Sequence, residues 1–251
     1  MPSFKIGKLG LRFQKHDPRD HKLSFGNLQN TVLPKSFSLK DKINHIYDQG
    51  QLSSCTANAI AQQFRIISNN TVQISRLYQY FNSRLIEDTQ FFDNGCTLRD
   101  CYKAIGKFNH VHEDEYPYIE SNVNVTPPPE LYIKANKNSI VHQYKSINND
   151  LTSLKYVLAI QKLHIVFGAI VYDSIQHLDE NFVVKDPDVT KDTELGGHAL
   201  LLFSYDDDKQ LFGICNSWSE NYGDHGCMYM SYKYITDKNL CSDFWCISCL
   251  F

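Results

Sequence analysis

The sequence lacks any long hydrophobic run, and this absence excludes a membrane-spanning helix. Its longest apolar stretch, residues 199–203, is far shorter than the about 20 residues that such a helix needs. The first residues also lack the continuous apolar core of a signal peptide, so we expect no export by that route. Basic residues are not in excess, because 25 Lys and Arg stand against 28 Asp and Glu. We therefore expect neither a membrane nor a nucleic acid as the partner.

Cysteine is scarce as well, which bears on disulfides and metals. Eight cysteines among 251 residues are too few for a disulfide scaffold, and without an export signal we expect reduced thiols. One Cys-x-x-Cys motif, Cys246 to Cys249, lies near the end of the sequence. A zinc site usually takes four ligands from two such pairs, and no second pair is present. We predict no metal and no cofactor.

Three consecutive prolines, residues 127–129, separate two halves of different character. Before them, apolar residues at helical spacing predict helices over about 55–67, 76–85 and 98–108. After them, 151–163 reads as a helix, and 165–171, 198–205, 211–218 and 227–234 read as strands. We predict an α+β fold of two lobes with a cleft between them. Residues 1–33 form an N-terminal arm or short pro-segment, 34–125 a mainly helical lobe, and 126–251 a mainly antiparallel, β-barrel-like lobe.

Cys55 falls in the first turn of the first predicted helix. Free backbone N–H groups and the helix dipole at that position lower the pKa of a thiol and favour the nucleophilic thiolate. Gln49 lies six residues upstream in a polar turn. Its amide and the backbone N–H of Cys55 can together form an oxyanion hole. A cysteine at a helix start is more often structural than reactive, so the interpretation depends on partners elsewhere.

Those partners are His198 and Asn216, on two strands predicted to form a hairpin. Asn216 can accept a hydrogen bond from one ring nitrogen of His198, which fixes the tautomer and leaves the other nitrogen for a thiol. Trp218 lies on the same face as Asn216 and can shield that bond from water. Taken alone, His198 is more often a satisfied core residue than a general base. Together the three residues fit a Cys-His-Asn triad.

The motifs DQGQLSSC (48–55), GHA (197–199) and NSW (216–218) resemble the papain-like cysteine peptidases in spacing and order. Four further stretches, 17–20, 75–77, 95–100 and 242–245, look like the bacterial and viral cathepsin-like branch. The resemblance covers nearly the whole chain after about residue 15. It implies a papain-like fold with a catalytic domain over 34–251, in which Cys55, His198 and Asn216 form the triad and Gln49 supplies the oxyanion donor.

The sequence departs from the family pattern near the nucleophile. The family usually pairs a cysteine three residues before the nucleophile with one downstream, whereas Leu52 stands in the first place and Cys96 in the second. Thr56 occupies the usual place of a tryptophan. The glycine pair that lines the family's P2 subsite is replaced around Leu98 and Arg99. We expect these two residues, with Gly197 and Trp218, to bind substrate, without predicting the preferred side chain.

The first 33 residues are too short and irregular for the long helical pro-region of many cathepsins. They either pack permanently as a belt, which we favour, or plug the cleft. The plug hypothesis predicts that deleting residues 1–30 raises turnover.

The resemblance implies a cysteine endopeptidase that acts on peptides or proteins through a thioester acyl-enzyme. Two alternatives remain open: a transpeptidase or ligase that uses the same triad, and a catalytically silent binding or virion component. We expect a cytoplasmic or virion-associated chain, monomeric by default.

Overall fold

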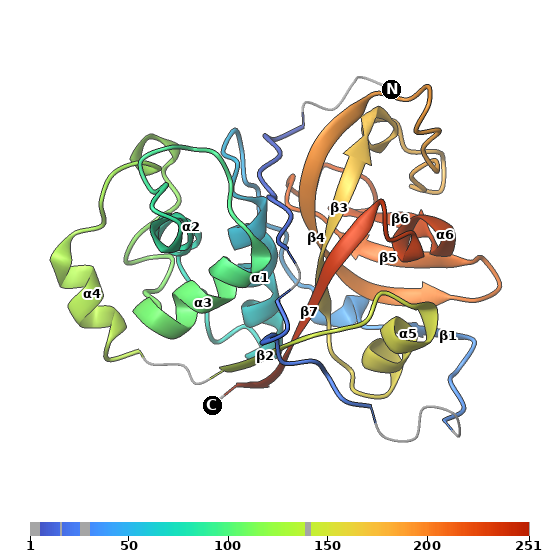
Figure 1. The fold of residues 1–251 in the computed structure, drawn as a ribbon, viewed down its shortest axis with the longest axis horizontal. Coiled ribbons are helices and arrows are strands. Elements are labelled where there is room, and N and C mark those ends of the chain that lie inside the picture. The colour runs from blue at the N-terminus through green and yellow to red at the C-terminus, as the bar shows by residue number, and fades with distance from the viewer. Residues whose placement is uncertain (1–5, 16, 26–30, 139–141, 251) are drawn as a thin grey trace.

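The computed structural model describes residues 6–15, 17–25, 31–138 and 142–250. Figure 1 shows two lobes, one of helices and one built around a curved sheet, with the N-terminal arm passing between them. The helical lobe contains the central helix α1 (Cys55–Ile67), with α2 (Arg76–Ile86), α3 (Leu98–Phe108), α4 (Pro129–Ala135) and the short 3-10 turn η3 (Glu120–Asn122). A further 3-10 turn, η2 (Lys40–Lys42), precedes α1.

Helix α1 is buried on both of its faces. The predicted apolar face, which includes Ile60 and Phe64, belongs to a buried apolar cluster that takes in residues of both lobes. The polar residue Gln63 on the other side is also buried, because the sheet lobe covers it. Its amide donates to the His164 carbonyl oxygen (2.9 Å) and accepts from the Tyr102 hydroxyl (2.6 Å). The helix therefore joins the two lobes, and its first residue lies at their junction.

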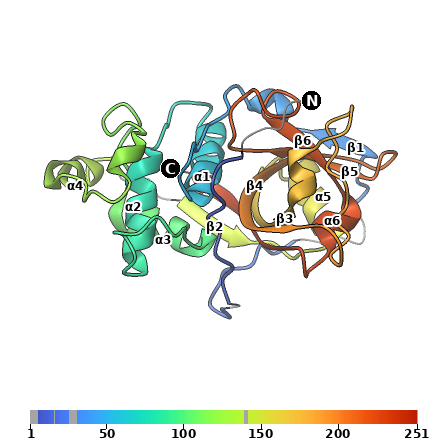
Figure 2. The ribbon, with the colours of Figure 1, turned by 90° about the horizontal axis from the view of Figure 1, so that it is seen from above.

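The sheet lobe consists of antiparallel strands in the order β2-β7-β3-β4-β5-β6. Strand β1 pairs with the C-terminal end of β4. Figure 2 shows the sheet curling round a core, but the strand order is an open path and not a closed barrel. The bounds are β1 (Ser36–Ser38), β2 (His142–Ser146), β3 (Ile165–Tyr172), β4 (Glu194–Asp206), β5 (Leu211–Cys215), β6 (Cys227–Ser231) and β7 (Cys241–Leu250). Helices α5 (Leu151–Ala159) and α6 (Tyr232–Thr236) and the 3-10 turn η4 (Asp173–Gln176) complete this lobe.

The predicted elements are present, but several end earlier than the sequence pattern indicates. Helix α5 stops at Ala159, and Lys162, with a φ of 55°, turns the chain into β3. Strand β6 gives way to α6 at Ser231, whose hydroxyl caps the new helix by accepting from the Tyr234 N–H. Strand β5 ends at Cys215 because the following residues turn toward the loop before α1, where the Gln49 N–H donates to the Ser217 carbonyl oxygen (2.9 Å).

The change of lobe falls after the three prolines and not at them. Pro129 is the first residue of α4, a position where proline's missing N–H costs nothing. Leu131 of α4 packs with Tyr78 of α2, and the Tyr132 hydroxyl donates to Asn82 (3.1 Å). Helix α4 therefore lies on the helical lobe. No helix in the described part of the chain is long and apolar enough to span a membrane.

Candidate active site

Cys55 is the first residue of α1 and is fully buried between the lobes. Its sulfur accepts hydrogen bonds from the backbone N–H groups of Ala199, Gly10 and Thr56. Ala199 follows His198 on β4, so the thiol lies directly against the strand that carries the predicted base. Gly10 belongs to the N-terminal arm, which therefore reaches the sulfur as well.

His198 and Asn216 lie together as the sequence predicts. The His198 Nε2 is 2.8 Å from the Asn216 Oδ1, and both side chains are buried. The Ser217 N–H donates to the same oxygen (2.8 Å), so the amide presents its carbonyl to the ring. Because Nε2 donates to Asn216, Nδ1 is the nitrogen with a free lone pair, and this buried atom has no hydrogen-bond partner among the described residues.

Gln49 is held rigidly beside this group. Its Oε1 accepts from the Ser217 hydroxyl (2.8 Å), which fixes the orientation of the amide. Its Nε2 donates to the Leu52 carbonyl oxygen (2.8 Å) and to the Lys8 carbonyl oxygen (2.7 Å). The carbonyl oxygen of Lys8, in the arm, thus accepts from the same Gln49 amide that the sequence predicts as the donor to the oxyanion. Sequence reasoning missed Ser217 as the residue that orients Gln49, although it stands inside the NSW motif.

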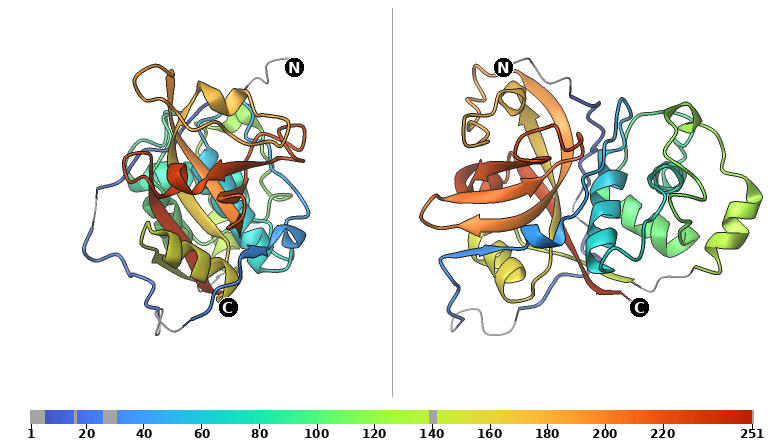
Figure 3. Two further views of the ribbon diagram at one scale, coloured as in Figure 1. Left: turned by 90° about the vertical axis from the view of Figure 1, so that its right-hand side faces the viewer. Right: turned by 180° about the vertical axis from the view of Figure 1, so that it is seen from behind.

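The arm runs between the two lobes (Figure 3), and its backbone is hydrogen-bonded to both of them. The Leu11 N–H donates to the Gly197 carbonyl oxygen of the sheet lobe (3.1 Å). On the helical side, the Cys96 N–H donates to the Gly10 carbonyl oxygen (3.0 Å) and the Arg12 N–H donates to the Cys96 carbonyl oxygen (3.1 Å). Residues 8–12 therefore lie over Cys55, in the place that the plug hypothesis requires.

Burial at the junction of the lobes shifts both titrating groups toward their neutral forms. Desolvation raises the pKa of Cys55 to about 11, against the smaller opposing effect of its backbone hydrogen bonds. Desolvation also lowers the pKa of His198 to about 4, and the bond to Asn216 only partly offsets it. With the arm in place, the pair is a thiol and a neutral imidazole near pH 7.

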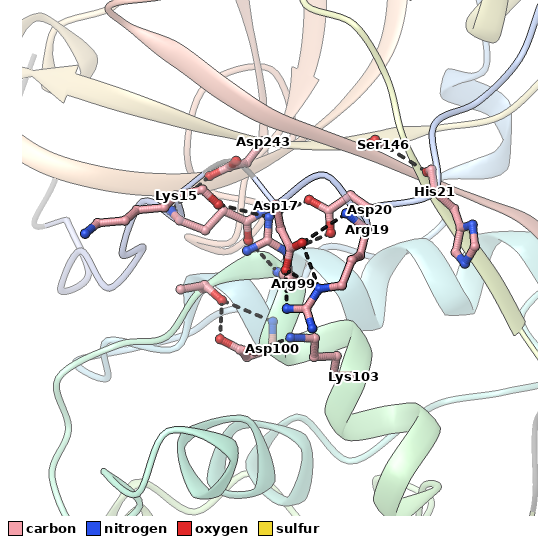
Figure 4. A network of polar contacts seen from close by, with 12 residues as sticks. Lys15, Asp17, Arg19, Asp20, His21, Arg99, Asp100, Lys103, Ser146 and Asp243 are labelled. Carbon is pink, nitrogen blue, oxygen red and sulfur yellow. Dashed lines mark hydrogen bonds and ion pairs between the residues drawn. The ribbon is translucent and has the colours of Figure 1, made fainter.

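A polar network fastens the arm farther along, as Figure 4 shows. The Arg99 Nε donates to Asp20 Oδ1 (2.8 Å), and its Nη2 donates to the Lys15 carbonyl oxygen (3.1 Å). The Arg99 backbone N–H donates to the Gln14 Oε1 (2.9 Å), and the Gln14 N–H reaches Asp243 (3.4 Å). The Arg99 and Asp20 side chains are only 12% and 16% exposed, so this ion pair is well shielded from solvent.

The four residues predicted to bind substrate have different surroundings. Gly197 faces the arm, since its carbonyl accepts from Leu11 and a Cβ on it would lie 2.5 Å from the Leu11 carbonyl oxygen. Trp218 stacks on the His198 ring (centroids 4.8 Å apart, 21° between planes) and is almost fully buried. Arg99 holds the arm through the network described above.

The role of Leu98 in substrate binding stays a prediction. Its side chain is fully buried in the apolar cluster around α1, because α3 begins at this residue with its apolar face inward. The backbone groups that bind the extended arm belong to Cys96, two residues earlier. A sequence pattern of side chains carries little signal for a residue that acts through its N–H and C=O.

Cys96 has lost the disulfide partner that the family pattern implies. The Cys96 sulfur lies 2.9 Å from the hydroxyl of Thr56, the residue that stands where the family usually has a tryptophan. Seven cysteines of the described chain are free: Cys55, Cys96, Cys101, Cys215, Cys227, Cys241 and Cys246. No group of three or more potential metal ligands occurs within the described ranges.

The fold and the motifs identify the class. The sequence model of the papain family of cysteine proteases matches residues 33–243. The chain therefore belongs to the papain family, and the expectations of a papain-like fold and a cysteine-type peptidase are confirmed. A peptidase acts on peptides or proteins, which agrees with the expected substrate class.

Particular relatives agree with the viral and bacterial branch. The chain is 33% identical to an uncharacterized peptidase C1-like protein of Acanthamoeba polyphaga mimivirus, over 86% of this chain and 73% of that protein. It is 32% identical to xylellain, a cysteine protease from Xylella fastidiosa, with a TM-score of 0.87 over 97% of this chain and 98% of that one. A digestive procathepsin L 3 of Tenebrio molitor shares the fold at 15% identity, with a TM-score of 0.69 over 97% of this chain and 76% of that one.

Proposed function

We propose that this protein is a cysteine endopeptidase whose nucleophile is Cys55, with His198 as acid and base and Asn216 as the residue that orients it. The observation that carries the proposal is the bond between His198 Nε2 and Asn216 Oδ1, which leaves Nδ1 for a thiol bonded to the next residue, Ala199. Gln49, oriented by Ser217, supplies one oxyanion donor, and the Cys55 N–H supplies the other.

The reaction then follows from these atoms. The Cys55 proton moves to His198 Nδ1, and the thiolate attacks the carbonyl carbon of the peptide. The negative charge that forms on the carbonyl oxygen is held by the Gln49 amide and the Cys55 N–H. The imidazolium returns its proton to the leaving amine, which leaves a thioester on Cys55. His198 next takes a proton from water, and the hydroxide attacks the thioester carbonyl carbon. The bond from carbon to the Cys55 sulfur breaks, the acid product leaves, and His198 returns the proton to the sulfur.

We further propose that residues 8–12 keep this site latent. The Lys8 carbonyl oxygen accepts a hydrogen bond from the Gln49 Nε2, and the Gly10 N–H donates to the Cys55 sulfur. Substrate therefore cannot reach either side chain while the arm is docked. The same coverage favours the neutral pair over the thiolate and imidazolium. Displacement of the arm restores solvent to the site and frees both reactive atoms.

The test compares the full chain, a chain lacking residues 1–12, and that shorter chain with Cys55→Ala, using a fluorogenic peptide mixture. The proposal predicts slow hydrolysis by the full chain, faster hydrolysis after deletion, and none in the Cys55→Ala variant. Hydrolysis that survives Cys55→Ala would refute the assignment of the nucleophile. Equal rates before and after deletion, with the shorter chain folded, would refute latency alone.

A further inference from the structure

Two cysteines that the proposed reaction does not use face each other at the ends of neighbouring strands. Cys215 is the last residue of β5, Cys227 is the first residue of β6, and the two are partners in the antiparallel ladder. The Asn216 N–H donates to the Gly226 carbonyl oxygen (3.0 Å), so residues 216 and 226 form a hydrogen-bonded pair and the cysteines beside them a non-hydrogen-bonded pair. In such a pair the Cα atoms are about 4.5 Å apart, which lies within the range that a disulfide spans.

The two sulfur atoms are also in contact. The Cys215 thiol donates a hydrogen bond to the Cys227 sulfur, and both side chains are buried. Backbone spacing and sulfur contact together meet the geometric needs of a disulfide. Strand β7, which carries the buried Cys241, is separated from β5 by β3 and β4, so this cysteine serves as a matched control.

The two thiols differ in reactivity. The hydrogen bond from Cys215 lowers the pKa of Cys227, and the positive charge of Lys40 lowers it further, against the opposing effect of desolvation. Lys40 forms an ion pair with Asp224, whose backbone N–H donates to the Cys227 carbonyl oxygen (2.7 Å). Cys227 is therefore the thiol that attacks an oxidant first, and Cys215 the thiol that completes a disulfide. An oxidant reaches the pair because a ladder opens most readily at its ends.

The residues between the two cysteines, 216–226, form one loop, which we call the site loop. It carries three residues that arrange the candidate active site: Asn216, Ser217 and Trp218. Its backbone has a positive φ at two residues other than glycine, Ser219 (66°) and His225 (51°), which is an uncommon conformation. Such a conformation persists only where the surrounding structure holds it, and the two cysteines stand where the site loop is held.

We propose that Cys215 and Cys227 form a reversible disulfide that clamps the base of the site loop, with a small disulfide such as glutathione disulfide as the oxidant. Cys227 loses its proton to solvent and attacks one sulfur of glutathione disulfide, which leaves a mixed disulfide and releases one glutathione thiolate. That thiolate takes the proton of Cys215, whose sulfur then attacks the Cys227 sulfur. The protein disulfide forms, and the second glutathione leaves as a thiolate that takes a proton from solvent. Two cysteine thiols are oxidised, and glutathione disulfide is reduced to two thiols.

The disulfide closes residues 215–227 into a ring. This ring removes conformational freedom from the unfolded chain, so the oxidised protein unfolds at a higher temperature. It also restricts local opening of the site loop, which would otherwise separate Asn216 from His198. Oxidation thereby stabilises the arrangement of the site residues without a change at Cys55.

The first experiment treats the native chain with glutathione disulfide and maps the bonds by mass spectrometry of a digest made without reductant. We expect a link between Cys215 and Cys227 that dithiothreitol removes. The link should form equally in Cys241→Ala and be absent from Cys227→Ala. A folded native chain that forms no link, or links another pair of cysteines in preference, would overturn the proposal.

The second experiment compares oxidised and reduced native chain, so it needs no substitution that could impair folding. The oxidised form should melt at least about 4 °C higher. The Asn216 amide should exchange its hydrogen at least tenfold more slowly after oxidation. In Cys227→Ala, the same treatment should change neither value. A Cys215–Cys227 disulfide that forms without slowing this exchange would overturn the clamp.

Both experiments are read without turnover, which separates this inference from the proposed function. If the chain lacking residues 1–12 hydrolyses no peptide, the proposed function fails and the mapped disulfide stands. If that chain hydrolyses peptides and no link forms in the native chain, only this inference fails.

Discussion

Gly10→Ala should open the cleft while adding a single methyl group to the protein. A Cβ on Gly10 would lie 1.8 Å from the Ser53 carbonyl oxygen and 2.7 Å from its Cα. Both are backbone atoms just before α1, where no flexible side chain can move aside. The arm must leave its place over Cys55 to accommodate the substitution.

The size of the effect follows from the contacts that arm docking provides. Four hydrogen bonds are lost together: Lys8 to Gln49, Gly10 to Cys96, Leu11 to Gly197 and Arg12 to Cys96. At about 0.5–1.5 kcal/mol net for each bond, the docked state loses about 2–6 kcal/mol. Since each 1.4 kcal/mol is a factor of ten, the open fraction rises by at least about 30-fold.

The assay is the second-order rate of Cys55 labelling by a peptidyl epoxysuccinyl inhibitor, read by intact mass. Arg19→Ala is the matched control, because the side chain of this arm residue is 86% exposed and, among the described residues, forms an ion pair only with its neighbour Asp17. Gly10→Ala should label at least about 30 times faster than native protein, and Arg19→Ala at the native rate. Native-like labelling of a folded Gly10→Ala protein would refute the reasoning that the arm covers the thiol.

Three further predictions follow from single contacts. In the Gly10→Ala background, Gln49→Ala should lower kcat about 10²–10³-fold with little change in inhibitor labelling, and Ser217→Ala should cause a smaller loss; a kcat unchanged by Gln49→Ala would remove the oxyanion role. In the chain with its native arm, Arg99→Ala should speed labelling of Cys55, though by less than Gly10→Ala does. Lys103→Ala removes a more exposed ion pair with Asp100 and should leave the labelling rate unchanged. Equal labelling rates for Arg99→Ala and Lys103→Ala would show that the Arg99–Asp20 pair does not hold the arm. Burial lowers the pKa of His110, His164 and His198 to about 4, so the unfolded state binds more protons between pH 6.5 and 4, and the melting temperature should fall over that range. Burial raises the pKa of Asp243 to about 6, so this residue binds a proton in the folded state over the same range and opposes the trend. Asp243→Asn should therefore make the melting temperature fall more steeply, and His164→Gln should make it fall less. A melting temperature that is constant from pH 7 to 4 would contradict these pKa shifts.

The sequence predicts the parts of the site that depend on local patterns. Helical spacing after Ser54 indicates α1, and the motif order indicates that His198 and Asn216 face each other, as their 2.8 Å contact shows. Contacts between distant segments leave no such pattern. Gly10 is an unremarkable glycine in an irregular stretch until its Cβ position is seen against Ser53.

Local patterns also give little information about the edge of the sheet and about the burial of Leu98. Strand β7 is interrupted by Asp243, with a φ of 57°, so its apolar residues do not alternate cleanly. It pairs with β2 and β3, which are distant in sequence, so the local sequence of β7 does not indicate these partners. The family resemblance places Leu98 where the P2 glycine pair usually stands, and the inward face of α3 decides its burial.

The most direct test of the central claim is peptide hydrolysis and inhibitor labelling by the opened Gly10→Ala chain, with and without Cys55→Ala. The account predicts one adduct and measurable hydrolysis with Cys55 present, and neither after Cys55→Ala. Hydrolysis or a full adduct that persists without Cys55 would contradict it.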